Sequence, residues 1–292
     1  MSTETVTGLS IRGLTLSIGD KRGATPILRG IDLEIPAGRV TGLAGESGSG
    51  KTMTGLAVCG LQPAGSQVGG VVELHSDRVQ VPNLLSLRSS ALNRVRGREV
   101  AMVFQDPTAS LHPMISIGGQ LTDHMRFHLG LSRRDARARA VDLLQRVHVP
   151  HAADALDRYP HQFSGGQLQR VAIASAIACD PGVLIADEPT TALDVTVQAG
   201  VLRLLRELCD DLELAVLLVT HDLGVMSAVA DTIAVMHRGE IVEHGDRYQV
   251  ITEPRSEYTR SLIESLPDTP PPGAAFVPDD ADADQEGATD AR

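Results

Sequence analysis

The stretch RVTGLAGESGSGKTMTGLAVCGL, residues 39–61, decides the fold of this chain. A short apolar run leads into a glycine-rich turn, and a helical pattern then opens at Lys51. The turn fits the spacing G-x-x-x-x-G-K-[ST] between a strand and a helix, where backbone N–H groups surround an anion. A chance glycine turn is the alternative, but the context favours a phosphate-binding loop. Its predicted contributors are Gly45, Ser47, Gly48, Ser49, Gly50, Lys51 and Thr52.

Two side chains of this loop are expected to act on a nucleotide and its metal ion. Lys51 would neutralise the β- and γ-phosphates, and the Thr52 hydroxyl would coordinate Mg²⁺. The chain has 26 basic residues, of which only Lys21 and Lys51 are lysines. Because a compact ammonium fits between packed phosphates better than a planar guanidinium, a lysine at this position supports the interpretation.

An acidic pair follows a second apolar run, VLIADE at residues 183–188. Asp187 and Glu188 would emerge at the carboxyl end of a buried strand, which is where α/β proteins bind ligands. Such a pair can also cap a helix. Beside a phosphate loop we expect chemistry instead, with Asp187 holding Mg²⁺ and Glu188 polarising the attacking water.

The remaining pattern predicts an α/β fold with two additions. Residues 14–19 and 31–36 alternate apolar and polar side chains, which indicates an N-terminal antiparallel hairpin, and residues 71–82 predict further edge β-structure. From about 115 to 180 the pattern is helical, and afterwards short apolar strands alternate with helices. We expect a mostly parallel core sheet with an N-terminal antiparallel β subdomain and an inserted helical subdomain, all within one domain over residues 1–267.

Composition narrows the classes of protein. The chain has 292 residues and 42% hydrophobic residues, its longest apolar runs are far too short to span a membrane, and no signal peptide is visible, so we expect a cytoplasmic location. Three widely separated cysteines predict buried free thiols. The net charge of -11 disfavours a nucleic-acid partner. Residues 268–292 hold seven acids and one arginine in a stretch rich in Pro, Ala and Asp, which predicts a disordered tail.

Five motifs together resemble those of ATP-binding-cassette (ABC) ATPases, in their order and approximate spacing. They are GESGSGKT (45–52), FQDP (104–107), FSGGQLQR (163–170), LIADEPTTALD (184–194) and VTHD (219–222). Four longer stretches resemble the dipeptide and oligopeptide importer subfamily, which also includes nickel importers: residues 103–113, 159–166, 186–199 and 257–267. The resemblance covers about residues 8–267 and implies the P-loop ABC ATPase fold.

The resemblance implies roles that the residues alone do not supply. Gln105 would touch Mg²⁺ and the γ-phosphate, and His221 would contact the γ-phosphate and order the attacking water. The family's Ser-Gly-Gly loop faces ATP held by a second ATPase subunit, and a loop aspartate communicates across that dimer. Here those positions are Ser164, Gly165, Gly166 and Gln167, together with Asp194.

The resemblance also implies partners and a location. We expect a second ABC ATPase subunit, either a copy or a paralogue, two transmembrane permeases and an external substrate-binding protein, with this chain at the cytoplasmic face of the membrane. ATP hydrolysis would drive import of di- or oligopeptides. Alternatives are import of nickel or another small solute, or a soluble ABC ATPase in translation or DNA repair. Translation members usually carry two cassettes and repair members a long coiled coil, and neither pattern occurs here.

Two further features concern the nucleotide base. A GTPase switch would need the motif N-K-x-D, and neither lysine has an adjacent asparagine. Family members commonly stack an aromatic ring from the first hairpin on adenine, but the first aromatic residue here is Phe104. Ile18 lies near the expected place and would offer an apolar contact, so we expect weak discrimination between ATP and GTP.

Overall fold

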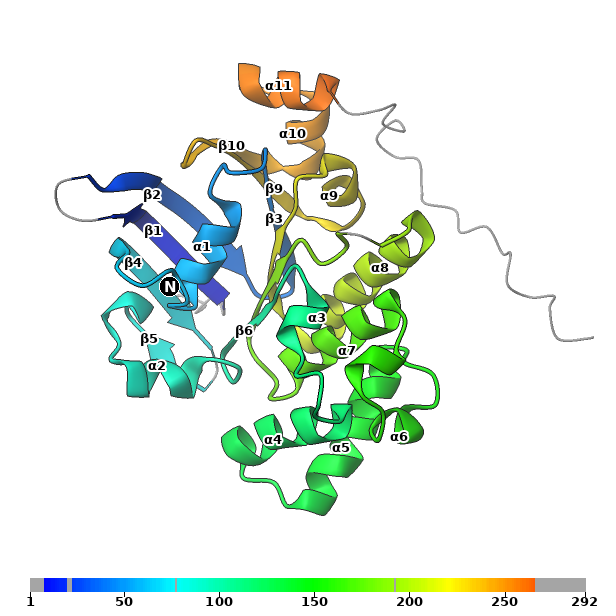
Figure 1. Ribbon diagram of the computed structural model, residues 1–292. Coiled ribbons are helices and arrows are strands. Elements are labelled where there is room, and N and C mark those ends of the chain that lie inside the picture. Colours follow the sequence, from blue (N-terminus) through cyan, green and yellow to red (C-terminus); the bar gives the residue numbers. More distant parts are fainter. Residues whose placement is uncertain (1–7, 20–22, 77, 192, 266–292) are drawn as a thin grey trace, which may run out of the picture.

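Two sheets and a set of helices make up the described part of the chain (Figure 1). The computed structural model describes residues 8–19, 23–76, 78–191 and 193–265. The predicted disordered tail, residues 268–292, lies outside the described residues.

The N-terminal sheet is antiparallel, with strand order β2-β1-β4-β5. Leucine and isoleucine side chains alternate with polar ones along much of its first two strands, so that one face is buried and the other is exposed to solvent. The predicted antiparallel hairpin is confirmed. The bounds of the strands are β1 (Gly8–Ile18), β2 (Thr25–Pro36), β4 (Gln67–His75) and β5 (Gln80–Val81).

The main sheet has the order β10-β9-β3-β8-β7-β6, and only its edge strand β10 runs antiparallel to its neighbour. The predicted mostly parallel core sheet is therefore present. Because the phosphate loop follows the central strand β3, it lies in the middle of the sheet's carboxyl edge. The bounds are β3 (Arg39–Ala44), β6 (Val100–Val103), β7 (Val183–Asp187), β8 (Ala215–Val219), β9 (Thr232–His237) and β10 (Glu240–Asp246).

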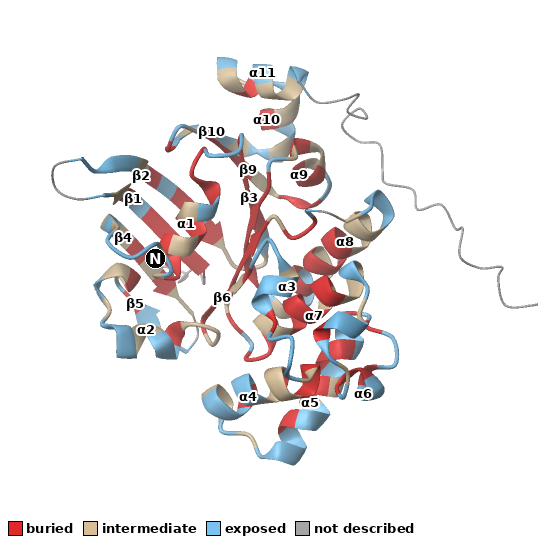
Figure 2. Ribbon diagram, in the orientation of Figure 1, coloured by how far each residue is buried: buried red, intermediate tan, exposed pale blue. Residues whose placement is uncertain are grey.

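Both faces of the main sheet are buried, as Figure 2 shows for its central strands. In β7, Val183 and Ile185 pack toward the N-terminal sheet, whereas Leu184 and Ala186 pack toward the helices on the other face. Burial on both sides explains why these strands read as unbroken apolar runs. The cysteines Cys59, Cys179 and Cys209 are free and buried in these two cores, as predicted.

Helices cover the main sheet and extend beyond it. The described chain between β6 and β7 contains helices and turns but no strand, and α4, α5 and α6 gather at the lower end of Figure 1. None of the helices in the described ranges combines the length and apolar character of a membrane span. The bounds are α1 (Lys51–Val58), η1 (Leu84–Ser86), α2 (Ser89–Val95), α3 (Pro107–Ser110), α4 (Ile117–Leu129), α5 (Arg133–Arg146), α6 (Ala152–Ala155), η2 (Pro160–Gln162), α7 (Gly165–Ile177), α8 (Val195–Leu212), α9 (Leu223–Val229), α10 (Arg247–Thr252) and α11 (Glu257–Glu264).

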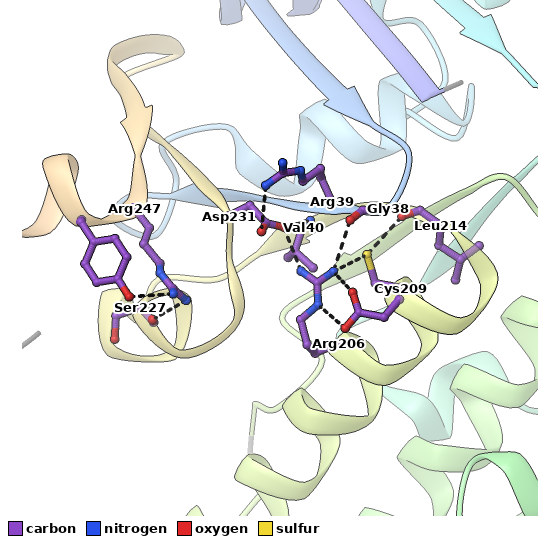
Figure 3. A network of polar contacts seen from close by, with 11 residues as sticks. Gly38, Arg39, Val40, Arg206, Cys209, Leu214, Ser227, Asp231 and Arg247 are labelled. Atoms are coloured by element: carbon purple, nitrogen blue, oxygen red, sulfur yellow. Dashed lines mark hydrogen bonds and ion pairs between the residues drawn. The ribbon is translucent and has the colours of Figure 1, made fainter. Parts of the chain in front are cut away.

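A polar network anchors the amino end of β3 (Figure 3). Arg206 of α8 donates to Asp231 Oδ2 at 2.8 Å and also pairs with Asp210. The same Asp231 oxygen accepts the Val40 N–H at 2.8 Å. Burial raises the pKa of the Asp231 carboxyl, but the Val40 amide and Arg206 outweigh this and lower it below its usual value. The network therefore fixes β3 against α8 and the start of β9.

Candidate active site

A cleft of about 790 Å³ lies at the carboxyl ends of β3, β7 and β8. The three strands are neighbours in the sheet, so the loops that follow them meet at one place. Most of the predicted catalytic and phosphate-binding residues are thereby brought together. The lining residues are Ile27, Glu46, Ser47, Gly48, Gly50, Lys51, Thr52, Met53, Gln105, Glu188, Thr191, His221, Leu262 and Ser265.

The phosphate loop turns sharply between β3 and α1, and its glycines allow the turn. Gly50 has φ of 113°, a conformation that L side chains rarely adopt, and a Cβ on Gly45 would lie 2.2 Å from Met236 O. Lys51 is 5% exposed, and its Nζ donates to Gly45 O at 2.7 Å and to Glu46 O at 2.8 Å. Burial lowers the pKa of the Lys51 ammonium, while the carboxylates of the site oppose this shift.

Ser49, in the middle of the loop, is buried at 5% exposure. Its Oγ has no hydrogen-bond partner among the described residues. A buried hydroxyl without a partner costs free energy, so such groups are found where a ligand or water completes the bonding. Ser49 Oγ is therefore the kind of group that a phosphate oxygen satisfies, and the loop fits the polyphosphate of a nucleotide.

Thr52 and Asp187 form the part of the site suited to a metal ion. The Thr52 hydroxyl donates to Asp187 Oδ1 at 3.1 Å, and Asp187 is 3% exposed at the end of β7. Burial raises the pKa of the Asp187 carboxyl, and the Thr52 hydrogen bond acts in the opposite direction. Hydroxyl and carboxylate oxygens are the hard ligands that Mg²⁺ prefers, so the residues present fit this ion.

Glu188 is held by three neighbouring side chains. Gln105 Nε2 donates to its Oε2 at 2.8 Å, the Thr191 hydroxyl donates to the same oxygen at 2.9 Å, and His221 Nδ1 lies 3.2 Å from Oε1. Its backbone has φ of 45°, a strained value for a residue with a side chain. Because such strain is stored where the surroundings enforce it, the conformation points to a functional carboxylate directed into the cleft.

The predicted partner-facing residues lie elsewhere. Ser164 begins α7, where its hydroxyl accepts the Gln167 N–H at 3.4 Å and Gln167 Oε1 accepts the Ser164 N–H at 3.3 Å. Asp194 caps α8 by accepting the Val197 N–H at 3.0 Å. In Figure 1, α7 lies well apart from α1. None of the five partner-facing residues lines the cleft: Ser164, Gly165, Gly166, Gln167 and Asp194. Gly45, Ser49 and Asp187 are also absent from the lining, although they adjoin residues that form it.

Several lining residues were missed by sequence reasoning. Thr191 belongs to the stretch ADEPTT, so its contact with Glu188 follows from its position three residues later. Ile27 of β2 lines the cleft, whereas Ile18 packs half-buried beside the core of the N-terminal sheet. Leu262 lies on α11 and Ser265 directly after it, more than 200 residues from the loop that they face. No local pattern signals such a distant contact.

Known proteins with similar sequences match nearly the whole chain. Residues 28–191 match the family described as ABC transporter. A peptide import ATP-binding protein of Brucella abortus is 44% identical over 269 residues, which cover 92% of this chain and 80% of that protein. The oligopeptide transport ATP-binding protein AppD of Bacillus subtilis is 40% identical, with 92% and 87% coverage. The glutathione import ATP-binding protein GsiA of Salmonella typhimurium is 41% identical and covers 89% of this chain, which spans 42% of GsiA.

Solved structures agree with the sequences. The dimeric structure of MJ0796, a bacterial ABC transporter cassette, has a TM-score of 0.69 at 27% identity and covers 82% of this chain and 98% of the cassette. The structure of cbiO1 from Clostridium perfringens, part of the ABC transporter complex cbiONQ, has a TM-score of 0.70 at 27% identity, with 90% and 96% coverage. The predicted fold is thereby confirmed. The chain belongs to the ABC transporter family, as one of its ATP-hydrolysing cassettes.

Proposed function

We propose that this protein is the energy-coupling ATPase subunit of an importer for di- or oligopeptides. The observation that carries the proposal is the convergence of Lys51, the Thr52–Asp187 pair and Glu188 on one cleft. A phosphate loop, oxygen ligands for a metal and a carboxylate near the γ-phosphate position are the parts that phosphoryl transfer to water requires.

The proposed reaction is hydrolysis of ATP to ADP and phosphate. The loop amides and Lys51 hold the β- and γ-phosphates, with Gly45 and Ser49 shaping the loop around them. Mg²⁺, held by Thr52, Asp187 and Gln105, would neutralise charge on these phosphates. Glu188 takes a proton from the attacking water. The water oxygen bonds to the γ-phosphorus as the bond between that phosphorus and the β–γ bridging oxygen breaks.

We also propose that the site is completed by a second ATPase subunit. Ser164, Gly165 and Asp194 are exposed and lie outside the cleft of their own chain. Because the first N–H groups of a helix have no acceptor within the helix, an exposed helix start offers them to an anion held by a partner. The dimeric MJ0796 cassettes, one of them bound to ADP and Pi, support this arrangement.

The loop after β6 supports the proposal of membrane partners. Gln105 reaches Glu188, while the adjacent Phe104 is 38% exposed and lines a separate groove of about 230 Å³ between β6 and the helices α4 and α7. Met114, farther along the chain, is 77% exposed. An apolar surface next to a catalytic contact suits docking of a permease subunit, so we place this chain at the cytoplasmic face of a membrane, below two permeases and an external binding protein.

The decisive test of hydrolysis is Glu188→Gln, with Glu213→Gln as the control. Glu213 is exposed at the end of α8. We expect Glu188→Gln to bind MgATP, to lose ATP turnover by at least about a hundredfold, and to accumulate as an ATP-bound dimer on gel filtration. Glu213→Gln should behave as wild type. Full turnover in Glu188→Gln would show that another group activates the water.

The transported solute needs a test in cells. The relatives named for peptides, oligopeptides and glutathione support a peptide, since glutathione is itself a small peptide. Cells carrying Glu188→Gln should lose uptake of labelled di- and oligopeptides and keep uptake of nickel. Purification from membranes should recover permeases with the wild-type chain. Loss of nickel uptake alone would favour a nickel importer, and recovery without any permease would favour a soluble ATPase.

A further inference from the structure

The last described helix, α11, borders the nucleotide cleft. Leu262 lies on this helix and Ser265 directly after it, and both line the cleft together with the phosphate loop. In Figure 1, α11 follows α10 at the end of the main sheet formed by β9 and β10. The C-terminal part of the described chain thus reaches the same space as the loop that follows β3.

Tyr258 of α11 makes a direct contact with the phosphate loop. Its hydroxyl accepts the Glu46 N–H at 3.2 Å. This N–H belongs to the peptide unit whose carbonyl, Gly45 O, accepts Lys51 Nζ at 2.7 Å. A trans peptide is planar with its N–H and C=O on opposite edges, so a bond that fixes the N–H also fixes the direction of the carbonyl. Tyr258 and Lys51 therefore hold the two edges of one peptide.

The ring of Tyr258 packs against one neighbouring ring. It lies against the His237 ring at the end of β9, with 4.0 Å between centroids and planes inclined at 39°. Burial raises the pKa of the Tyr258 phenol, so it remains neutral at physiological pH. A neutral acceptor beside the phosphate loop does not repel the phosphates, as a carboxylate in the same place would.

A buried carboxylate holds the start of α11. Glu243 of β10 is 7% exposed and accepts the Arg255 N–H at 2.8 Å and the Ser256 N–H at 3.0 Å. Burial raises the pKa of the Glu243 carboxyl, but these hydrogen bonds outweigh it and lower the pKa below its usual value. Because Ser256 is the N-cap of α11, Glu243 sets where the helix begins and hence where Tyr258 lies.

We propose that Tyr258 is a positioning residue of the nucleotide site, through which the docking of α11 and nucleotide binding are coupled. The inference rests on the proposed function of the cleft. With Tyr258 in place, the Gly45–Glu46 peptide keeps Lys51 aimed at the β- and γ-phosphate positions before ATP arrives. Without its hydroxyl, the peptide rotates more freely, since Gly45 has no side chain to restrain it.

The test compares Tyr258→Phe with Tyr248→Phe in the full chain. Tyr248 is 51% exposed on α10, and its hydroxyl accepts a hydrogen bond from Arg247 instead of from the loop. Tyr258→Phe should raise the Kd for MgATP and the KM for hydrolysis about fivefold, with kcat changed less than twofold, as expected for one lost hydrogen bond. Tyr248→Phe should leave all three unchanged.

A second variant and a second measurement separate positioning from general stability. Glu243→Gln weakens the anchor of α11 without touching the loop, and it should raise KM in the same direction with kcat retained. Hydrogen exchange of the α11 amides should slow when MgATP is added to wild type, and this protection should shrink in Tyr258→Phe, because coupling is reciprocal.

The outcomes distinguish this inference from the function beneath it. If wild type binds MgATP and Tyr258→Phe matches it within twofold in Kd and KM, Tyr258 has no positioning role while the proposed function stands. If wild type does not bind MgATP, the proposed function itself fails. A fall in kcat of tenfold or more with KM unchanged would also overturn the positioning role.

Discussion

Charged and polar groups lie near both ends of strand β3, but they are paired within the protein at one end and incompletely paired at the other. At its amino end, Arg206 and Asp231 bond to each other and to the Val40 amide, so each charge has a partner within the fold. At its carboxyl end, Lys51 is bonded only to backbone carbonyls and Ser49 Oγ has no partner among the described residues. Asp187, at the carboxyl end of β7, is also buried, and burial raises the pKa of its carboxyl.

The difference separates polar groups that stabilise a fold from those that await a ligand. Removing one member of a network whose donors and acceptors are paired leaves its partners unsatisfied and lowers the stability of the fold. A site whose groups are incompletely satisfied is a poor contributor to stability and gains when phosphates and a metal supply the missing partners. Substitutions at the two ends should therefore affect different measurements.

The largest expected effect is the loss of nucleotide binding in Lys51→Ala, at the carboxyl end of β3. Loss of the ammonium removes the charge-assisted bonds to the β- and γ-phosphates, and the Kd for MgATP should rise at least about a hundredfold. Isothermal titration calorimetry measures it directly. Arg39→Ala at the other end of the strand is the control, since the Arg39 side chain is 63% exposed and pairs with Asp231 at 3.4 Å, away from the cleft. Tight MgATP binding by Lys51→Ala would remove this lysine from the site.

Next in size is the loss of hydrolysis in Ser164→Arg. An arginine at this exposed position would block the partner's γ-phosphate, so steady-state hydrolysis should fall about a hundredfold or more while MgATP binding stays within about twofold. Ser132→Arg is the matched control, because Ser132 caps α5 in the same manner and on the surface. Each variant loses a cap worth about 1 kcal/mol. Equal hydrolysis in the two variants would contradict a role for Ser164 across a dimer.

A smaller effect, and one on stability, is expected from Asp231→Ala. Loss of this partly buried carboxylate leaves the Val40 amide without its acceptor and Arg206 with Asp210 as its remaining carboxylate partner. Urea unfolding should show a loss of about 2 kcal/mol with the Kd for MgATP unchanged. Asp210→Ala, which removes the more exposed partner of Arg206, should cost less than about 1 kcal/mol. If Asp231→Ala changed the free energy of MgATP binding as much as the free energy of unfolding, the amino end of β3 would not be purely structural.

The same pair predicts the pH dependence of stability. The Asp231 pKa is lower in the folded chain than its usual 3.8, so its contribution is fully present above the unfolded pKa and is lost as the pH falls through the folded value. The difference between wild type and Asp231→Ala should therefore be constant near neutral pH and should shrink below about pH 3.8. Urea unfolding at a series of pH values measures this.

The smallest effect concerns the base of the nucleotide. The cleft lining includes Ile27, Met53 and Leu262, whose apolar side chains do not read the hydrogen-bonding edge of a purine. The Kd values for MgATP and MgGTP should agree within about threefold in competition binding. A preference for ATP of tenfold or more would mean that polar groups read the base.

Much of the fold follows from local patterns. The apolar runs of β7 and β8 identify strands buried on both faces, and the glycine spacing places the loop between β3 and α1. The same reasoning anticipates that Asp187 and Glu188 lie near Lys51, because parallel strands end at one edge of the sheet. Contacts that are close in sequence, or fixed by strand direction, are predictable.

Other parts of the fold and of the site depend on tertiary packing and could not be predicted from the sequence. The antiparallel edge strand β10 follows β9 after a short turn at residues 238–239, and its sequence alone does not identify it as a separate strand. Tyr258 reaches the phosphate loop across 212 positions, and its α11 is only eight residues long. Whether Ile18 or Ile27 faces the cleft depends on the register of the first hairpin, which the alternation alone leaves unspecified.

Burial of the Lys51 ammonium opposes folding, as the lowered pKa of this group indicates. Water is stripped from the charge when the chain folds, so the penalty is already met before ATP arrives. Stability is thereby traded for readiness to bind, as is common at active sites. Because MgATP binds the folded state, it raises the free energy of unfolding by mass action. The cassette is expected to resist unfolding best in a cell with a high ATP concentration.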